Sequence, residues 1–437
     1  MRVDVAPLLE ALRACRPDGV GVGAWSVFVT EQRQLSVGTR DGDTASVHTP
    51  VRLSESAGAR YLVVWEDGKV SRGSLERRQL TRDAADALRR ARSAAYDDPD
   101  AAQVLGPQTF PEVIVHDGRV ARWVDGDIGV LAQRIAKIRD RLESNAFRVW
   151  SGSMTASEGR SRILSSRGLE AESPETSVGW HVSFEGEWGD GSSARTPDSE
   201  SEYERRLDRL AETVRCLGRP VPPMPPGVHP VILHPHVVET LVIGTLLHNL
   251  DGSSVAHGEG YFKRADFGSN RPLLRDDLSL VLDPLLPLRS GSYRFTPEGV
   301  PAARCTYIRN GRLETPILDL KHARRLGMAA TPVPFGRDTL VLETSTSMSE
   351  AEAYAEAAGG ALVLSVLGVH TQDPASGDFS LSAPQTLALS ARGPEGRIRA
   401  TLSGNVFAVL RDERLTLVRF EGETTPGLLF PCRLDPA

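Results

Sequence analysis

The chain has 437 residues, of which 40% are apolar and 25% are charged, and this composition excludes a disordered or fibrous protein. At about 100–200 residues per domain, the length fits about two to four domains, whose cores need no metal or disulfide for stability. The 51 basic and 57 acidic side chains leave a formal net charge of −6, which argues against nucleic acid or an anionic membrane as a partner.

The amino-terminal half mixes helical and strand patterns, and we expect residues 1–218 to form an α+β domain with an antiparallel sheet. Helical spacing of apolar residues predicts helices near residues 5–12, 81–95, 128–144 and 202–216, with Thr81 as an N-cap. Alternation predicts strands at residues 20–30, 34–40, 147–156, 160–165 and 177–187, with tight turns at residues 41–43 and 66–68.

A proline-rich segment divides the chain. Five prolines lie between residues 218 and 227, and they exclude a helix or a central strand there. We therefore interpret residues 219–228 as an extended connector between two domains.

Residues 229–437 consist mostly of short apolar runs separated by Gly, Pro and Asp, which predicts a strand-dominated, barrel-like or sandwich-like domain. The expected strands are at residues 230–233, 278–282, 306–309, 340–343, 361–369, 386–389, 397–403 and 415–420. Helices are expected at residues 237–250, 318–326 and 349–358, and the absence of a fixed repeat excludes a solenoid or propeller.

One group of residues just after the connector has the composition of a metal site. His229, His234 and His236 are followed by Glu239, and imidazole and carboxylate groups are zinc ligands. Pro235 between two of the histidines favours the other interpretation, in which the segment is an exposed junction between a strand and a helix.

Other catalytic motifs are incomplete. His248 is followed by Asn249, whereas a zinc peptidase needs a glutamate there as general base. No G-x-S-x-G elbow and no Walker loop is present. The four cysteines, Cys15, Cys216, Cys305 and Cys432, lack close spacing, and no signal peptide or membrane-spanning run is visible, so we expect a cytoplasmic protein with free thiols.

Glycine-containing loops punctuate the last third of the chain, at Gly368, at Gly377-Asp378-Phe379-Ser380 and at Gly404-Asn405. By their residue types alone they predict turns between strands. Together with Pro297-Glu298-Gly299-Val300-Pro301 and Leu318-Asp319, they resemble the motifs of the TldD/PmbA family in their order along the chain. Residues 166–170 also resemble a step of that family, so the resemblance covers nearly the whole chain and is most specific over residues 295–410.

The resemblance implies a role for the chain. TldD-like members carry H-E-x-x-x-H and bind zinc, whereas TldE (PmbA)-like members lack it and pair with the first kind. In one alignment Asn249 replaces the glutamate and Ser253 stands at the second histidine. The alignment we prefer puts Gly252-Ser253-Ser254-Val255 on the glycine-rich step of TldE-like chains, and His248 is then incidental. Cys432 does not match the late cysteine of TldD-like members convincingly.

The chain is thus expected to be a non-catalytic TldE-like subunit, with no cofactor and no catalytic residue of its own. Its partner would be a TldD-like paralogue that holds zinc, and the heterodimer would cut an amide in a peptide or small conjugate within an enclosed chamber. The arginine-rich composition and the divergence from the family favour a natural-product (antibiotic) pathway. The −6 charge gives no support to the family's older name, modulator of DNA gyrase.

Two other hypotheses remain at this point. The chain could be an independent homodimeric hydrolase that uses His229, His234, His236 and Glu239, or a binding module that selects substrates for several hydrolases.

Overall fold

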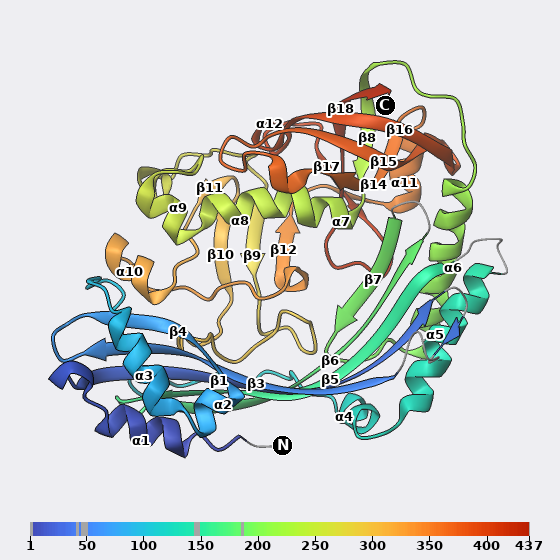
Figure 1. Ribbon diagram of the computed structural model, residues 1–437. Helices are drawn as coiled ribbons and strands as arrows, with labels where there is room; N and C mark the ends of the chain where they lie inside the picture. Colours follow the sequence, from blue (N-terminus) through green and yellow to red (C-terminus); the bar gives the residue numbers. More distant parts are fainter. Residues whose placement is uncertain (1–2, 41–42, 45–50, 144–148, 185–187, 437) are drawn as a thin grey trace.

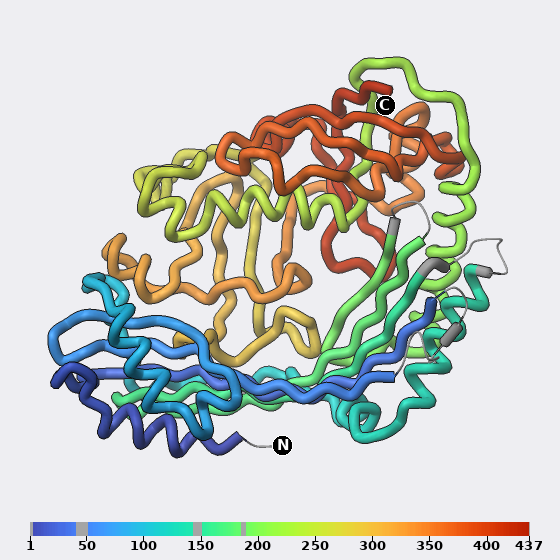
Figure 2. Tube along the Cα trace, in the orientation of Figure 1, coloured from blue at the N-terminus to red at the C-terminus, as the bar shows by residue number. Residues whose placement is uncertain are grey.

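The computed structural model describes residues 3–40, 43–44, 51–143, 149–184 and 188–436. The fold is α+β, as predicted: a long antiparallel sheet from the amino-terminal half faces a carboxyl-terminal part that contains a barrel-like sheet (Figure 1). Figure 2 shows the blue-to-green half of the chain below the yellow-to-red half, joined at one side by the extended segment that follows residue 217.

The amino-terminal sheet has seven strands, and every pairing within it is antiparallel. The order is β4-β3-β1-β5-β6-β7, with β2 paired to the end of β1. The strands are β1 (Val22–Arg40), β2 (Asp43–Thr44), β3 (Arg52–Trp65), β4 (Val70–Glu76), β5 (Val149–Ser165), β6 (Glu170–Phe184) and β7 (Trp188–Ala194).

Two groups of helices cover the two ends of this sheet, because strands of 15 to 19 residues are too long for one group to cover. The first group packs Leu8, Leu80 and Leu88 on β1 and β3, and the second packs Ile135 and Leu207 on β5 and β6. The helices are α1 (Ala6–Ala14), α2 (Arg77–Thr81), α3 (Ala84–Ser93), α4 (Gly118–Val124), α5 (Ile128–Glu143) and α6 (Glu200–Leu217).

Strand β1 is continuous, although the sequence predicted two strands separated at residues 31–33. Glu31 and Arg33 pair with Arg160 and Glu158 of β5, and the Glu31 carboxylate accepts a hydrogen bond from the Val3 N–H (2.7 Å). Strand β5 likewise runs through the predicted break at residues 157–159, where a Cβ on Gly159 would come within 2.3 Å of the Glu31 backbone oxygen. Polar residues that pair across the strands interrupt the apolar alternation at both places, so the sequence pattern predicted breaks where the strands are continuous.

The predicted helix at residues 81–95 corresponds to α3, and a separate short helix, α2, precedes it. Thr81 ends α2, and Asp83 precedes α3, so the expected N-cap role of Thr81 was wrong. The helices expected at residues 128–144 and 202–216 correspond to α5 and α6, with Ser144 outside the described residues. In the turn expected at residues 41–43, Asp41 and Gly42 also lie outside them.

The proline-rich segment crosses from α6 to the carboxyl-terminal sheet in extended conformation. It is fixed at Val221, whose N–H donates to the Arg397 carbonyl (3.1 Å), and at Arg219, whose carbonyl accepts from the Arg397 N–H (2.7 Å). The first strand of the carboxyl-terminal part begins at Gly227, within the range that the sequence assigned to the connector.

Five carboxyl-terminal strands form a closed ring, in the order β8-β14-β15-β16-β18 and back to β8. They are β8 (Gly227–Leu233), β14 (Ala361–Leu367), β15 (Asp378–Ser390), β16 (Gly393–Asn405) and β18 (Gly427–Pro436). Strands β17 (Thr416–Arg419) and β13 (Ser347–Ser349) extend this sheet beyond β18. The sequence predicted either a sandwich-like or a barrel-like domain, and the structure shows the barrel-like arrangement.

A second sheet of four strands packs into the same core as the barrel. Its order is β11-β10-β9-β12, and its strands are β9 (Ser279–Leu282), β10 (Cys305–Arg309), β11 (Arg312–Leu313) and β12 (Leu340–Glu343). The helices of this half are α7 (Pro235–Val237), α8 (Gly244–Leu250), α9 (Gly252–His257), α10 (Leu320–Leu326), α11 (Glu350–Glu356) and α12 (Val406–Val409). Across the described ranges, none of the helices is long and apolar enough to cross a membrane.

The loop between β17 and β18 joins the two halves through α6. Glu421 forms ion pairs with Arg205 and Arg209 (both 3.2 Å), and Arg206 donates to the Gly422 carbonyl (3.0 Å). Glu423 lies 3.4 Å from Arg206. These contacts hold the carboxyl-terminal barrel against the helical end of the amino-terminal sheet.

Replacing Glu423 by Gln should stabilise the protein at pH 8 and have little effect near pH 4.5. Burial, reinforced by Asp190 and Glu239 and opposed by Arg206 and Arg209, raises the pKa of Glu423 to about 7. A raised carboxyl pKa gives stability that is present below the unfolded-state pKa and is lost as the pH rises through about 7. Because the side chain is 37% exposed, we expect a difference of about 1–2 kcal/mol at pH 8.

Urea unfolding of both proteins at pH 4.5, 6 and 8 measures this difference. An identical pH dependence for the two proteins would contradict the assignment of Glu423 as the titrating group at this contact.

Candidate functional site

A buried helical segment runs between the barrel and the four-stranded sheet (Figure 1). It begins with α7, continues through a π-helical turn, η2 (Val238–Ile243), and ends with α8. Val242, Leu246 and Leu250 belong to the core that it shares with both sheets. The sequence predicted one regular helix over residues 237–250; the structure inserts a π turn, a feature frequent at functional sites.

Asn249, at the end of α8, is completely buried, and its amide group forms hydrogen bonds within the protein. Its Nδ2 donates to the carbonyls of Thr245 (2.8 Å) and Pro374 (2.7 Å), and its Oδ1 accepts from the Tyr261 N–H. The side chain therefore joins α8 to two loops. Because an amide group is not basic, the Asn249 side chain cannot take a proton from water.

His248, the neighbouring residue, is exposed and lies at a cavity of about 250 Å³. The cavity is also lined by His370, Asp373 and Asp378, which come from the segment between β14 and β15 and from the start of β15. This arrangement offers imidazole and carboxylate groups for hydrogen bonding to a polar ligand.

The glycine-containing loops of the last third converge beside this cavity. In the β15–β16 pairing, Asp378 lies opposite Asn405, and Phe379 lies opposite Gly404. The Asn405 amide donates to the Asp378 carboxylate (2.7 Å), and its Oδ1 caps α12 through the Ala408 N–H (2.9 Å).

Glycines and one backbone hydrogen bond shape these loops. Gly368 and Gly377 have left-handed φ angles of 91° and 74°, which favour glycine. The Ser380 N–H donates to Gln372 Oε1 (3.1 Å). A Cβ on Gly404 would come within 2.8 Å of the Phe379 ring. These contacts give the motif residues a role in building the loops next to the cavity.

The histidines after the connector point to different partners. His229 lies on β8 and its Nε2 donates to the Pro225 carbonyl (2.8 Å). His234 follows β8 as the N-cap of α7, its ring packs on Phe420, and burial lowers its pKa to about 3.

The other two members of that group are also separated in their roles. His236 is exposed in α7. The Glu239 carboxylate accepts from Thr425 Oγ1 (2.7 Å), while its carbonyl accepts from Arg337. Hydrogen bonds within the protein thus occupy His229 and Glu239, and the metal site at this segment stays a prediction.

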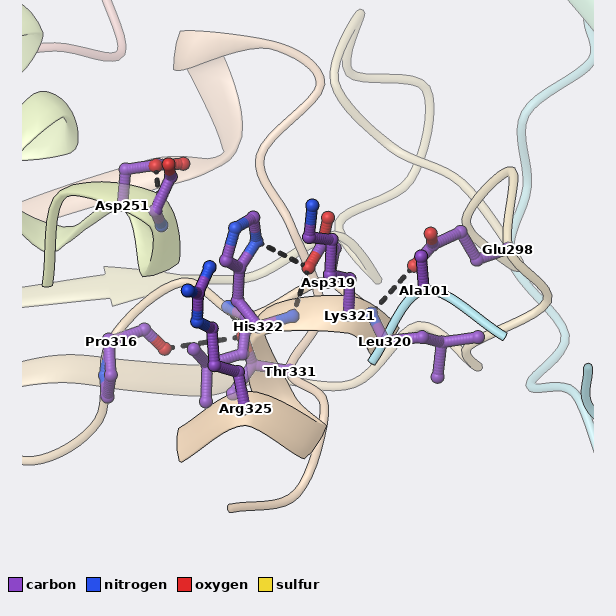
Figure 3. A network of polar contacts seen from close by, with 12 residues as sticks. Ala101, Asp251, Glu298, Pro316, Asp319, Leu320, Lys321, His322, Arg325 and Thr331 are labelled. Carbon is purple, nitrogen blue, oxygen red and sulfur yellow. Dashed lines mark hydrogen bonds and ion pairs between the residues drawn. The ribbon is translucent and has the colours of Figure 1, made fainter. Parts of the chain in front are cut away.

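A second polar network lies at the start of α10 (Figure 3). Asp319 Oδ1 accepts from both the backbone N–H and the Nδ1–H of His322, at 2.8 and 2.7 Å. Because a carboxylate oxygen can only accept, this bond requires a proton on His322 Nδ1. Both residues line a cavity of about 390 Å³ together with Asp251 and Ser253, which belong to the start of α9.

Glu298 joins the same network from the other side. Its Oε2 accepts from the Leu320 N–H (2.8 Å), and Oε1 lies 3.5 Å from Arg72 of the amino-terminal sheet (Figure 3 shows Glu298 beside Leu320). Burial raises the pKa of the Glu298 carboxyl. Sequence reasoning placed Glu298 and Asp319 in motifs only; His322 was missed, and its spacing of three residues from Asp319 in a helical segment was the available signal.

The side chains at α8 do not fit a catalytic zinc ion. Asn249 is committed to three hydrogen bonds, and Ser253 Oγ lies 3.3 Å from His257 Nδ1. Cys432 is buried on β18, donates to the Ser403 carbonyl (3.4 Å), and has its pKa raised to about 12 by burial. Within the described ranges, no three His, Cys, Asp or Glu side chains form a group that could hold a metal ion.

Comparisons with known proteins agree on the carboxyl-terminal part and on the fold. Residues 226–426 match the model of the PmbA/TldA metallopeptidase C-terminal domain. An uncharacterized protein of Methanocaldococcus jannaschii is 23% identical over 308 residues, which cover 66% of this chain and 69% of that protein.

Solved structures are similar over almost the full length. TldE from Thermococcus kodakarensis has a TM-score of 0.77 at 17% identity, with 95% of this chain and 97% of that chain covered. A protein described as a candidate modulator of a DNA gyrase from Thermotoga maritima has a TM-score of 0.76 at 19% identity, with coverages of 98% and 99%. At these identities the structural likeness shows a shared fold.

Proposed function

We propose that this chain is the TldE-like, non-catalytic subunit of a heterodimeric zinc metallopeptidase or amidohydrolase, because residues 226–426 match the PmbA/TldA metallopeptidase C-terminal domain and the fold is similar to that of TldE. A TldD-like paralogue is the proposed partner and holds the zinc. The chain itself supplies one wall of the enclosed space in which an amide bond is cut.

The observation that carries this proposal is that Asn249 is buried and fully hydrogen-bonded within the protein. A zinc hydrolase of this kind needs a carboxylate beside its first histidine, to take a proton from the attacking water. Here that position holds a fully buried amide, which donates two hydrogen bonds and accepts one. An amide has no useful basicity, so the chemistry of this helix supports a structural role.

A second wall has a physical use in such an enzyme. An extended peptide or a small amide conjugate needs surfaces on both sides to exclude bulk water and hold the bond near the metal. The exposed His248 and the carboxylates of Asp373 and Asp378 would offer polar contacts on this wall. The substrate we propose is an amide in a peptide or small conjugate, within a natural-product pathway.

The proposed location is the cytosol. The four cysteines are free thiols, and they are scattered over both halves of the chain. Free thiols are typical of a reducing compartment.

The test is to express the chain alone and together with a TldD-like paralogue from the same genome. We expect no bound zinc and no amidase activity on a casein digest for the chain alone, and a one-to-one complex with zinc and activity for the pair. A partner variant in which the motif glutamate is replaced by Gln serves as control, because the complex should form without activity.

Other outcomes favour the remaining hypotheses. Stoichiometric zinc and activity in the chain alone, both abolished by His236→Ala, would establish an independent hydrolase. Stable capture of several different hydrolases, rather than one paralogue, would establish a substrate-selecting module.

A further inference from the structure

A cavity of about 500 Å³ lies away from α8, between the amino-terminal sheet and the loop that carries Glu298. Residues of β1, β3 and β4 line its floor, and Pro297, Glu298 and Leu320 line its roof. A volume of this size is typical of a site for a small molecule.

The floor is built from two rows of neighbouring side chains. Arg60 lies opposite both Phe28 of β1 and Ser74 of β4 in the strand register. Leu62, two residues further along β3, lies opposite Ser26 and Arg72. Since residues two apart on a strand share a face, both rows face the cavity and place two guanidinium groups beside an apolar surface.

The charges of this cavity are incompletely paired. Arg60 packs over the Phe28 ring, 5.5 Å from its centre, and has no carboxylate partner in the part of the chain that the structure describes. Arg72 donates one hydrogen bond to the Ala101 carbonyl (3.3 Å) and one to the Glu298 carboxylate (3.5 Å). Two guanidinium groups against one carboxylate leave the cavity with an excess of one positive charge.

Uncommitted polar groups complete the lining. The side chains of Ser26, Ser74 and Gln103 line the cavity and have no hydrogen-bond partner among the described residues. Leu62, Pro297 and Leu320 supply apolar surface between these groups and the charges. The cavity therefore presents a cation, a carboxylate oxygen and an apolar wall within one volume.

We propose that this cavity binds a small apolar α-amino acid, free or as the carboxyl-terminal residue of a short peptide. The ligand carboxylate pairs with Arg60, its amino group or amide N–H donates to Glu298, and its side chain lies against Leu62 and Leu320. Arg72 bridges the two ends, since it contacts Glu298 and shares the floor with Arg60. This site stands on contacts within one chain and does not depend on the proposed hydrolase complex.

The experiment is calorimetric titration of the full chain with leucine, N-acetylleucine and leucinamide. Leucine should bind best, N-acetylleucine should bind more weakly because it lacks the ammonium group, and leucinamide should bind at least about tenfold more weakly because it lacks the carboxylate.

Variants locate the site. Arg60→Met keeps the apolar stem and should weaken leucine binding about tenfold or more, whereas Arg52→Met, an exposed arginine on the same strand, should leave it unchanged. Glu298→Gln retains an acceptor for the Leu320 N–H and should weaken leucine binding without affecting N-acetylleucine by more than about twofold.

Three results would overturn the proposal: equal affinity for leucine and leucinamide, unchanged affinity in Arg60→Met, or binding of inorganic phosphate alone. None of these results bears on zinc or activity in the paired complex, so the two proposals fail separately.

Discussion

Replacing Asn249 by glutamate should destabilise the protein by about 3–5 kcal/mol and should not create a zinc site. Glutamate is the residue that zinc peptidase motifs carry beside their first histidine. At this position it would put a carboxylate in a completely buried environment and remove both donors to Thr245 and Pro374. An unpaired buried charge and two unsatisfied carbonyls account for the expected loss.

Two further variants separate the causes. Asn249→Asp has nearly the shape of asparagine, so its loss of stability reports the missing donors and the charge without the added methylene. His248→Ala, at the exposed neighbouring position, should change the free energy of unfolding by less than about 0.5 kcal/mol. Urea unfolding followed by circular dichroism gives the stabilities, and elemental analysis gives the zinc content.

The informative exception would be an Asn249→Glu protein that folds with the stability of the wild type and binds one zinc ion. Such a result would show that the helix retains a latent metal site, and the non-catalytic assignment of the chain would fail with it.

The parts of the fold that the sequence predicted well are those fixed by local chemistry. The helix expected after Ser349 is α11, whose capping box joins Ser349 to Glu352 over three residues. The glycine-containing loops were recognised because Gly377 and Asn405 perform turn and cap functions that depend on their own residue types.

The parts that the sequence did not predict depend on contacts between distant segments. Ring closure of the barrel pairs β8 with β18, so that His229 lies opposite Cys432, and no local pattern specifies that register. The unbroken β1 depends on Glu31 and Arg33 meeting partners on β5.

The candidate sites divide in the same way. Asn249 was identified from its place in a motif, but its burial and its bond to Pro374, 125 residues further along, come from the tertiary structure. Arg72 and Glu298 are 226 residues apart and belong to different halves of the chain. A cavity whose charge depends on such a pair is invisible to spacing arguments.

Truncating Phe407 to alanine is the second large effect that we expect, a loss of about 3–5 kcal/mol in the free energy of unfolding. The ring is completely buried, stacks on Tyr261 with centres 3.9 Å apart, and meets the edge of Phe262 at 5.4 Å. Removing it leaves a cavity between α12 and the loop of Gly377, where an added Cβ would come within 2.7 Å of the ring.

The control is Phe335→Ala, because that ring is 48% exposed and contacts Tyr293 near the surface, so its loss should be under about 1 kcal/mol. A small effect of Phe407→Ala, comparable with this control, would contradict the packing described here.

The two large effects should also be coupled. Tyr261 stacks on Phe407 and donates its backbone N–H to Asn249, so both side chains hold the same loop against α8. In a double-mutant cycle, Phe407→Ala with Asn249→Asp should therefore cost less than the sum of the single losses, by about 0.5–3 kcal/mol. Additive losses would mean that the loop is held independently at the two positions, and that the amide of Asn249 fixes α8 without help from the aromatic cluster.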